Sequence, residues 1–398
     1  MSHSPDQSPR PTDRLPVGTS PVFGGPAPDR APGSPEPSER SASDDADDAV
    51  RAAGDRADRR GRRAPETVVA TPAGTGSGAL PEGALGGSPE YVDDGWPARL
   101  DHDDYHALVR ERVADLNRLD PDGDRLVPGS RLLVALDVDG TILDMAGRVS
   151  ERVMAAVARL RTYGAQVVIS TGRGVQAALP VARHVGLTDG WMICANGALT
   201  LRMDPDARGG YDVVESLTFD PAPAIDRLHA ALPDAIVATE DLEHGFRGSR
   251  RFPEGELIET QSVVSLDELR AEPVTRIILR APGVPVEEFT AAVDAAGLEA
   301  VEYAIGWTAW LDVAPGGVTK ASALESLAAR VGSDASRTVA VGDGTNDVAM
   351  LAWAGAGAVM GSAPQEVKDI GDLVTADVWR DGCAAVLDAI IERTRDLV

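Results

Sequence analysis

The stretch Arg131-Leu132-Leu133-Val134-Ala135-Leu136-Asp137-Val138-Asp139-Gly140-Thr141 sets the fold of this chain. Its apolar run, Leu132–Leu136, has no polar interruption, which is typical of a strand buried on both faces of a parallel sheet. Asp137 and Asp139 follow this strand at once, and Gly140 allows a sharp turn. Two carboxylates in a tight turn at the end of a strand can hold a hard cation and present a nucleophile.

Short apolar runs alternate with amphipathic stretches on the C-terminal side of this segment. They predict further strands at 167–169, 191–194, 338–341 and 356–360, and helices at 150–164, 175–184 and 347–353. Strands that alternate with helices indicate an α/β fold, with a Rossmann-like parallel sheet and right-handed crossovers. Ligands of such sheets bind beyond the carboxyl ends of the strands.

The middle of the chain has a different pattern. Strands are expected at 211–217, 235–239, 274–279 and 298–303, and helices at 222–231, 266–271 and 286–296. We therefore predict a catalytic core at 131–200 and 311–398 and an inserted α+β module at 201–310.

Residues 1–90 hold 14 of the 28 prolines and a single aromatic residue, Phe23. Such a segment cannot bury enough apolar surface to offset its ordering entropy, so we predict a disordered extension. Residues 91–130 are expected to be a partly helical lead-in. Asp120, Asp122 and Asp124 alternate there like calcium ligands, but arginines occupy the positions where an EF-hand requires Gly and Glu, so we predict a turn.

The composition limits the classes of function. A net charge of −25 argues against a nucleic-acid partner and against binding to an anionic membrane. No apolar run reaches the roughly 18 residues that a membrane span needs. The two cysteines, Cys194 and Cys383, give no disulfide framework, so a cytoplasmic location is expected.

Four clusters carry chemistry, and each follows a predicted strand or opens a predicted helix. Besides Asp137-Val138-Asp139-Gly140-Thr141, they are Ser170-Thr171-Gly172-Arg173, the helix-opening Lys320, and Gly342-Asp343-Gly344-Thr345-Asn346-Asp347. Hydroxyl, guanidinium and ammonium groups suit phosphate oxygens. Each cluster alone is weak evidence, whereas all four in this order point to one site.

In this order the clusters resemble motifs I to IV of the haloacid dehalogenase (HAD) superfamily. Three segments resemble more narrowly the Cof-type branch, subfamily IIB, which carries a C2B cap: Thr171-Gly172-Arg173, Asn196-Gly197-Ala198 and residues 342–351. About 150 residues separate Thr171 from Lys320. This is where the resemblance places a C2-type cap.

The resemblance implies a role for each motif residue. Asp137 would be the nucleophile, Asp139 the general acid and base, and Thr171 and Lys320 would hold the phosphoryl oxygens. Further phosphate-binding residues would be Gly172, Arg173, Asn196 and Asn346. The implied cofactor is Mg²⁺, held by Asp137, the backbone carbonyl of Asp139, Asp343 and Asp347. One departure from the family pattern is Ala321, where a glycine commonly follows the motif III lysine.

The implied function is a Mg²⁺-dependent phosphatase that hydrolyses a small phosphorylated metabolite, such as a sugar phosphate, a nucleotide or a phosphorylated cofactor, through an aspartyl-phosphate. Two alternatives remain open: a HAD phosphomutase and a non-catalytic HAD-fold interaction protein. Specificity would come from the cap, with Glu240, Arg247, Arg276, Trp307 and Trp310 as candidates. The sequence predicts neither the substrate nor the oligomeric state.

Overall fold

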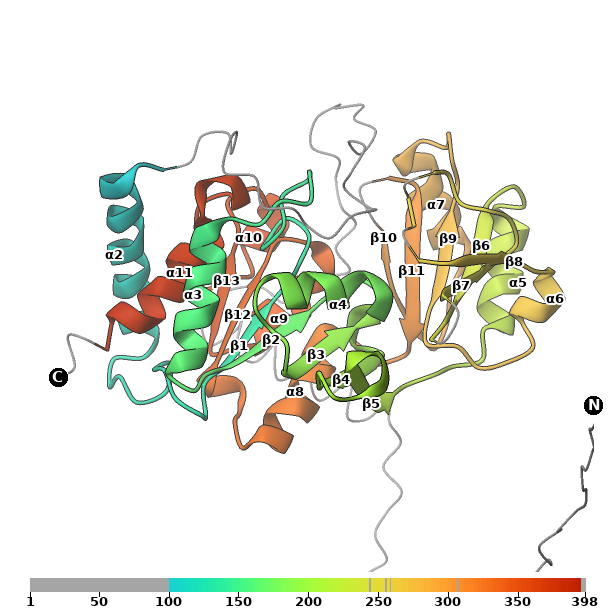
Figure 1. Ribbon diagram of the computed structural model, residues 1–398. Helices are drawn as coiled ribbons and strands as arrows, with labels where there is room; N and C mark the ends of the chain where they lie inside the picture. The colour runs from blue at the N-terminus through green and yellow to red at the C-terminus, as the bar shows by residue number, and fades with distance from the viewer. Residues whose placement is uncertain (1–99, 243–244, 255, 258, 306–307, 395–398) are drawn as a thin grey trace, which may run out of the picture. The chain divides into compact units, whose positions relative to one another are not determined.

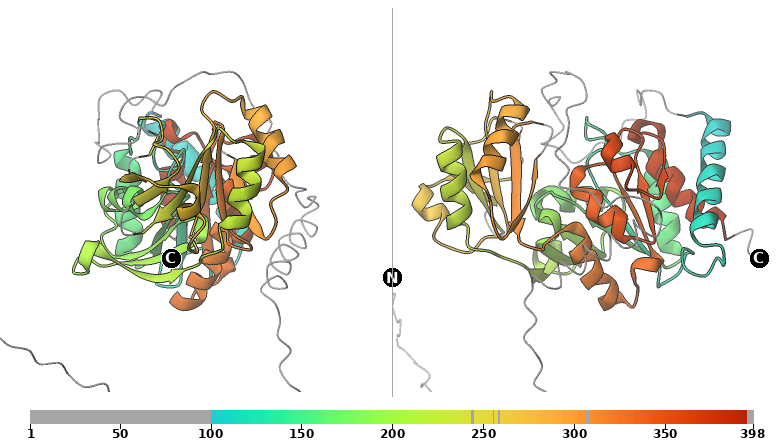
Figure 2. Two further views of the ribbon diagram at one scale, coloured as in Figure 1. Left: turned by 90° about the vertical axis from the view of Figure 1, so that its right-hand side faces the viewer. Right: turned by 180° about the vertical axis from the view of Figure 1, so that it is seen from behind.

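The computed structural model describes residues 100–394 except 243–244, 255, 258 and 306–307, and these residues build two β-sheets with flanking helices (Figures 1 and 2). The larger sheet contains β1 (Leu133–Leu136), β2 (Gln166–Ser170), β3 (Gly190–Cys194), β4 (Leu199–Met203), β5 (Tyr211–Ser216), β12 (Thr338–Gly342), β13 (Ala356–Val359) and β14 (Leu373–Val374). Their order is β14-β13-β12-β1-β2-β3-β4-β5. The strands from β14 to β3 pair in parallel, whereas β4 and β5 are antiparallel additions at one edge.

Strand β1 lies at the centre of this sheet. Leu133 pairs with Thr338 of β12 on one side and with Gln166 of β2 on the other. All four residues of β1 are buried, because helices cover both faces. The α/β core with a parallel sheet is therefore confirmed, as is the reading of Leu132–Leu136 as a strand buried on both sides.

The two faces of the larger sheet have separate apolar cores. One face packs against α2 (His102–Leu119), α3 (Glu151–Thr162), α4 (Val175–His184) and α11 (Gly382–Glu392). The other packs against α8 (Lys320–Val331), α9 (Val348–Trp353) and α10 (Gln365–Lys368). Successive residues of β1 serve opposite cores, since Leu133 and Ala135 face α8 and α9 while Val134 and Leu136 face α3 and α11.

The smaller sheet has the order β10-β11-β9-β6-β7-β8. Its strands are β6 (Ile236–Asp241), β7 (Gly245–Gly248), β8 (Gln261–Val263), β9 (Ile277–Arg280), β10 (Val301–Ile305) and β11 (Trp310–Pro315), and its helices are α5 (Ala222–Ala231), α6 (Leu266–Leu269) and α7 (Val286–Ala296). The domain bounds predicted at 201 and 310 fall within β4, a strand of the larger sheet, and at the start of β11, a strand of the smaller one. The division into domains therefore stays a prediction.

The turn after α2 is a structural element. The Asp120 carboxylate accepts hydrogen bonds from the backbone N–H groups of Arg125 and Leu126 and from the side chain of Arg393, which is buried with it. Burial opposes the charged form, but the hydrogen bonds from Leu126 and Arg125 hold the pKa of Asp120 below its usual value. The Asp120 carboxylate thus holds this turn together, and the turn lies where the sequence predicted one.

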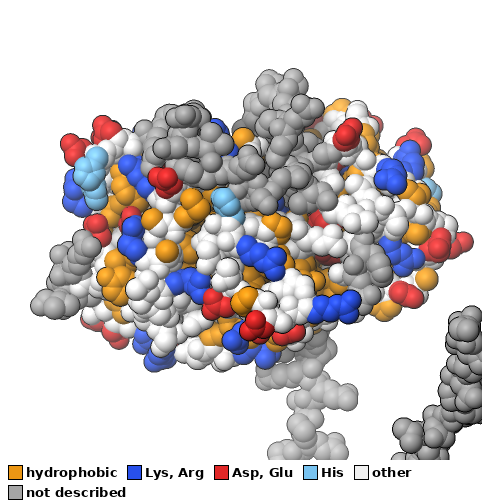
Figure 3. Space-filling view, in the orientation of Figure 1, with side chains coloured by type: hydrophobic (Ala, Val, Ile, Leu, Met, Phe, Trp, Pro, Cys, Tyr) orange, Lys and Arg blue, Asp and Glu red, His pale blue; other side chains and the backbone are white. Residues whose placement is uncertain are grey.

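The predicted disordered extension, residues 1–90, lies outside the described residues. Within the described part, no helix combines the length and the apolar composition that crossing a bilayer requires. On the face shown in Figure 3, basic and acidic side chains are interspersed.

Candidate active site

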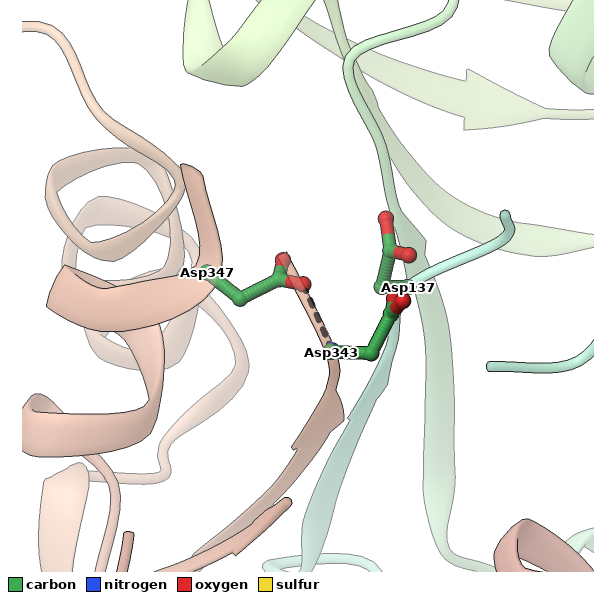
Figure 4. Close-up of side chains that lie close together, drawn as sticks. All are labelled: Asp137, Asp343 and Asp347. Carbon is green, nitrogen blue, oxygen red and sulfur yellow. Dashed lines mark hydrogen bonds between the residues drawn. The ribbon is translucent and has the colours of Figure 1, made fainter. Parts of the chain in front are cut away.

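The carboxyl ends of β1 and β12 bring the first and fourth sequence clusters together. Asp137 follows β1 directly, and its backbone N–H donates to the carbonyl oxygen of Val341 in β12 at 3.0 Å. Asp343 follows β12, and Asp347 ends the short 3-10 helix Thr345–Asp347 and directly precedes α9. The three aspartates face one another at this edge of the sheet (Figure 4).

The three carboxylates form a compact buried group. Asp137, Asp343 and Asp347 can each offer one oxygen such that all three oxygens lie within 4.8 Å of one another. Burial raises the pKa of Asp137 to about 7, and the nearby charge of Asp347 adds to the rise. Burial likewise raises the pKa of Asp343 to about 8, helped by Asp137 and Asp347. Such a group of oxygen donors fits a hard divalent cation, which would relieve the repulsion.

Lys320 provides positive charge inside this group. It is the first residue of α8, whose N-cap Thr319 accepts a hydrogen bond from the backbone N–H of Ser322. The side chain of Lys320 is fully buried, and its Nζ donates to Oδ1 of Asp137 at 2.7 Å and to Oδ1 of Asp347 at 2.6 Å. Although burial alone would lower the pKa of Lys320, the charges of Asp137 and Asp347 raise it, so the ammonium stays protonated.

Lys320 was predicted as a site residue, and the scarcity of lysine in the chain is a further sequence signal for it. Of the 38 basic residues in the chain, Lys320 and Lys368 are the only lysines, and the other 36 are arginines. An ammonium is a compact point charge that fits between two carboxylates, whereas a planar guanidinium requires more room. With arginine at 36 of the 38 Lys and Arg positions, the lysine at 320 fits a position where the smaller cation matters.

The turn after β1 is shaped to let Asp343 approach. Gly140 has φ +81, and a Cβ on it would lie 2.2 Å from Oδ2 of Asp343. The Oγ1 of Thr141 donates to Oδ1 of Asp343 at 3.2 Å. Any side chain at position 140 would displace the Asp343 carboxylate.

Asp139 differs from the other acidic residues of the site. Its side chain is 56% exposed and forms an ion pair with Arg173, whose Nε donates to Oδ2 of Asp139 at 2.8 Å. A second guanidinium nitrogen of Arg173 donates to Oδ1, so the contact is bidentate. Arg173, predicted to bind phosphate, thus contacts the predicted general acid and base.

The remaining motif residues line the same edge. Thr171 is buried at the end of β2, and its Oγ1 accepts a hydrogen bond from the backbone N–H of Arg173 at 3.1 Å. Asn346 Nδ2 donates to Oδ1 of Asn196 at 2.9 Å, which ties the fourth cluster to the turn after β3. Gly172 contributes its backbone carbonyl, which accepts a hydrogen bond from Arg276.

The cap candidates have different positions. Arg276 and Glu240 are buried and lie against Gly172 and Gly174. Trp310 donates its indole N–H to Asp312. Arg247 is half-buried in β7, and Trp307 lies outside the described residues. The predictions did not include Glu259 and Asp312, which lie in the same cluster, because neither belongs to a motif.

Comparisons with known proteins agree with this geometry. The family of haloacid dehalogenase-like hydrolases matches residues 134–387. The 5-amino-6-(5-phospho-D-ribitylamino)uracil phosphatase of Bacillus subtilis (strain 168) is 29% identical over 265 residues, which cover 64% of this chain and 96% of that protein. The pyridoxal phosphate phosphatase of Escherichia coli (strain K12) is 30% identical over 272 residues, with 63% and 96% covered.

A solved structure described as a HAD subclass IIB sugar phosphatase superposes with a TM-score of 0.55 at 22% identity, covering 65% of this chain and 100% of that chain. This likeness concerns the fold. The family match begins at residue 134, in β1, so α2 and the residues before it lie outside that match.

Proposed function

Because this chain belongs to the haloacid dehalogenase-like hydrolase family and is a phosphatase of its subfamily IIB, we propose that it hydrolyses a small phosphorylated metabolite through an aspartyl-phosphate on Asp137, with Mg²⁺ as cofactor. A sugar phosphate, a nucleotide and a phosphorylated cofactor are the candidate substrate classes. The curated relatives named above, phosphatases of a ribitylamino-uracil phosphate and of pyridoxal phosphate, support a small metabolite.

One observation carries the proposal: a buried Asp137 carboxylate lies between a lysine ammonium and two further carboxylates. Lys320 Nζ lies 2.7 Å from Oδ1 of Asp137, and oxygens of Asp343 and Asp347 lie within 4.8 Å of the group. If Lys320 served only to form a structural ion pair, one carboxylate partner would be enough, whereas this site contains three carboxylates. When bound there, Mg²⁺ would supply charge neutralisation between the nucleophile and the incoming phosphoryl oxygens.

The proposed reaction has two steps. A carboxylate oxygen of Asp137 attacks phosphorus in line while the bond to the leaving oxygen breaks, and Asp139 donates a proton to that oxygen. Asp139 then takes a proton from a water molecule, which attacks the phosphoaspartate and releases inorganic phosphate. Asp139 therefore ends each cycle protonated and ready for the next substrate.

The residues around Asp137 would position the phosphoryl group. Lys320 would neutralise an equatorial oxygen, Thr171 would donate its hydroxyl, and the linked amides of Asn196 and Asn346 would support the same group. Arg173 donates to both oxygens of Asp139, so this contact would open when the protonated carboxyl turns to the leaving group. Phosphoryl transfer gains mostly from such positioning and charge neutralisation.

The test is phosphate release from a panel of phosphorylated metabolites with Mg²⁺, using Asp137→Asn alongside the unchanged enzyme. Asp122→Asn, an exposed substitution of the same kind, serves as the control. We expect release by the enzyme and the control and none by Asp137→Asn. Equal release by Asp137→Asn would refute the covalent mechanism, and phosphate returned to another position of the sugar without release would favour a phosphomutase.

A further inference from the structure

Among the described residues, the helices of the smaller sheet cover one of its faces. Helices α5 and α7 share an apolar core with Ile277, Leu279 and Leu311 on one face. Side chains alternate along a strand, so their neighbours Arg276, Ile278 and Asp312 point to the opposite face. We call Glu240, Glu259, Arg276 and Asp312 the cap charge cluster; Glu240 lies at the end of β6, Arg276 before β9 and Asp312 in β11.

The cap charge cluster touches the second motif directly. Arg276 Nη1 donates to the backbone carbonyl of Gly172. A Cβ on Gly174 would lie 2.4 Å from Glu240 Oε1, 3.1 Å from Glu259 Oε1 and 3.3 Å from Arg276 Nη2. The glycine therefore permits these three side chains to approach the segment that carries Thr171.

Arg276 has more acidic neighbours than it can satisfy. Its Nη1 lies 3.2 Å from Oδ1 of Asp312, and its Nε lies 3.4 Å from Oε2 of Glu240. The Nε is buried and makes no hydrogen bond to a described residue. Glu259 is 9% exposed and forms no hydrogen bond or ion pair with any residue in the described part of the chain.

The charges in the cap charge cluster do not balance. The Arg276 guanidinium faces the carboxyl groups of Glu240, Glu259 and Asp312, all largely removed from water, while the nearby Arg173 is paired with Asp139. Burial raises the pKa of Glu240 and of Asp312, although Arg276 lowers both. Glu240 also accepts a hydrogen bond from Thr275 and Asp312 one from Trp310, so Glu259 has the fewest donors among the described residues. A buried carboxylate without a full set of donors costs free energy, so the arrangement favours a ligand that brings donors.

Arg173 connects the cap charge cluster to the catalytic residues. Burial alone would lower the pKa of Arg173, but the hydrogen bonds to Asp139 and the nearby charges of Asp139, Asp137 and Glu259 raise it. The Arg173 guanidinium is therefore near enough to both Asp137 and Glu259 to be influenced by their charges. A substrate whose phosphate lies at Asp137 would extend its organic part toward this region.

We propose that the cap charge cluster binds the leaving group of the substrate and selects leaving groups rich in hydroxyl or amino donors over those that carry a carboxylate or a second phosphate. This inference rests on the proposed phosphatase function. Carboxylate oxygens of Glu240, Glu259 and Asp312 accept hydrogen bonds from hydroxyl or ammonium groups, and Arg276 donates to a hydroxyl oxygen. An anionic leaving group would meet like charge in a water-poor site, which is the repulsion by which binding sites reject wrong partners.

The test compares matched pairs of substrates in which a neutral group is replaced by a carboxylate. Glycerol 3-phosphate is paired with 3-phosphoglycerate, and glucose 6-phosphate with 6-phosphogluconate. The measured quantity is the ratio of kcat/KM for the neutral member to that for the acidic member. We expect this ratio to exceed about 10 for the better pair, since like-charge contact costs more than the 1.4 kcal/mol that a factor of 10 represents.

Two variants assign the selectivity to the cap charge cluster. Glu240→Gln and Asp312→Asn keep the shape and remove one negative charge, so each should lower the ratio by about 10-fold. Glu256→Gln is the matched control, because Glu256 pairs with Arg280 at the far end of β9 at 2.7 Å. Both substrates of a pair are measured on the same enzyme preparation. A smaller fraction of folded enzyme therefore lowers both kcat/KM values by the same factor and leaves their ratio unchanged.

The outcomes separate this inference from the proposed function. Phosphate release that depends on Asp137, with ratios near 1 or with faster turnover of the acidic members, would overturn the selectivity and leave the phosphatase intact. A ratio unchanged in both Glu240→Gln and Asp312→Asn would also overturn it. Failure to release phosphate from any compound would overturn both.

Discussion

Replacing Lys320 with Met removes the ammonium from the carboxylate group while retaining a long apolar stem. Lys320 is fully buried, and its Nζ makes charge-assisted hydrogen bonds of 2.7 Å to Asp137 and 2.6 Å to Asp347. Each hydrogen bond to a charged group contributes about 1.5–3 kcal/mol, so two give about 3–6 kcal/mol. Removing one partner of a buried ion pair costs about 3–5 kcal/mol, which is the same range.

This loss should depend on pH, and its sign follows from the raised pKa values. A carboxyl group whose pKa is higher in the folded state contributes stability at low pH, which is lost as pH rises through the folded-state value. For Asp137 and Asp343 these values are about 7 and about 8 with Lys320 present. Without the ammonium both pKa values rise further. At pH 6 a proton on these carboxyl groups can therefore replace the positive charge lost with Lys320, whereas at pH 8 their protonation is less complete.

Urea unfolding in EDTA measures the effect. We expect Lys320→Met to lower the free energy of unfolding by about 3–5 kcal/mol at pH 8 and by clearly less at pH 6. Phosphate release should fall by about 10²–10³, because a preorganised donor to the phosphoryl group is lost. Lys368→Met, at the end of α10, is the matched control and should change neither quantity. An equal loss of stability at the two pH values, or unchanged turnover, would refute this account of the site.

Three further results are expected. Asp343→Asn should abolish the rise in Tm that Mg²⁺ gives the unchanged enzyme. In EDTA at pH 8.5 the same variant should have a higher Tm than the unchanged enzyme, because one of three crowded carboxylates has gone. A lower Tm in EDTA would contradict the repulsion between these carboxylates. Asp139→Asn should reduce phosphate release by about 10²–10⁴ while Tm changes little, since its carboxyl is exposed; normal release would exclude it as acid and base. Arg393→Met should cost about 3–5 kcal/mol in urea unfolding, because Asp120 loses its buried partner, with kcat unchanged; a kcat that falls in the folded variant would refute a purely structural role.

The sequence predicted the core and most helices because local patterns determine them. Helices α4, α5 and α7 begin and end at the predicted residues, since their apolar stripes are bounded by a Gly or Pro at the N-cap and, for α7, by Gly297 at the C-cap. The apolar run before Asp137 could become only a central strand. The local pattern therefore predicted which strand or helix each motif residue follows or opens.

Contacts between distant segments could not be predicted in this way. The ion pair between Asp139 and Arg173 joins turns after two different strands, and nothing in either turn indicates which of several arginines takes part. Glu259 precedes a short strand in a loop without a motif, so only the folded chain shows that it lies at Gly174. The strand expected at 211–217 was assigned to the inserted module, which is wrong, because it forms β5 at the edge of the larger sheet. Nothing in its sequence indicates which of the two sheets it joins.

The central place of β1 has a consequence for synthesis of the chain. Its neighbour β2 leaves the ribosome soon afterward, but its other neighbour, β12, is made only after every strand of the smaller sheet. The nascent chain must therefore keep one edge of β1 unpaired, with Asp137 lacking its ammonium partner, while the smaller sheet assembles from contiguous segments. An unpaired apolar edge is a site for aggregation. Chaperone binding during that interval, and slow release from it, would follow from this strand order.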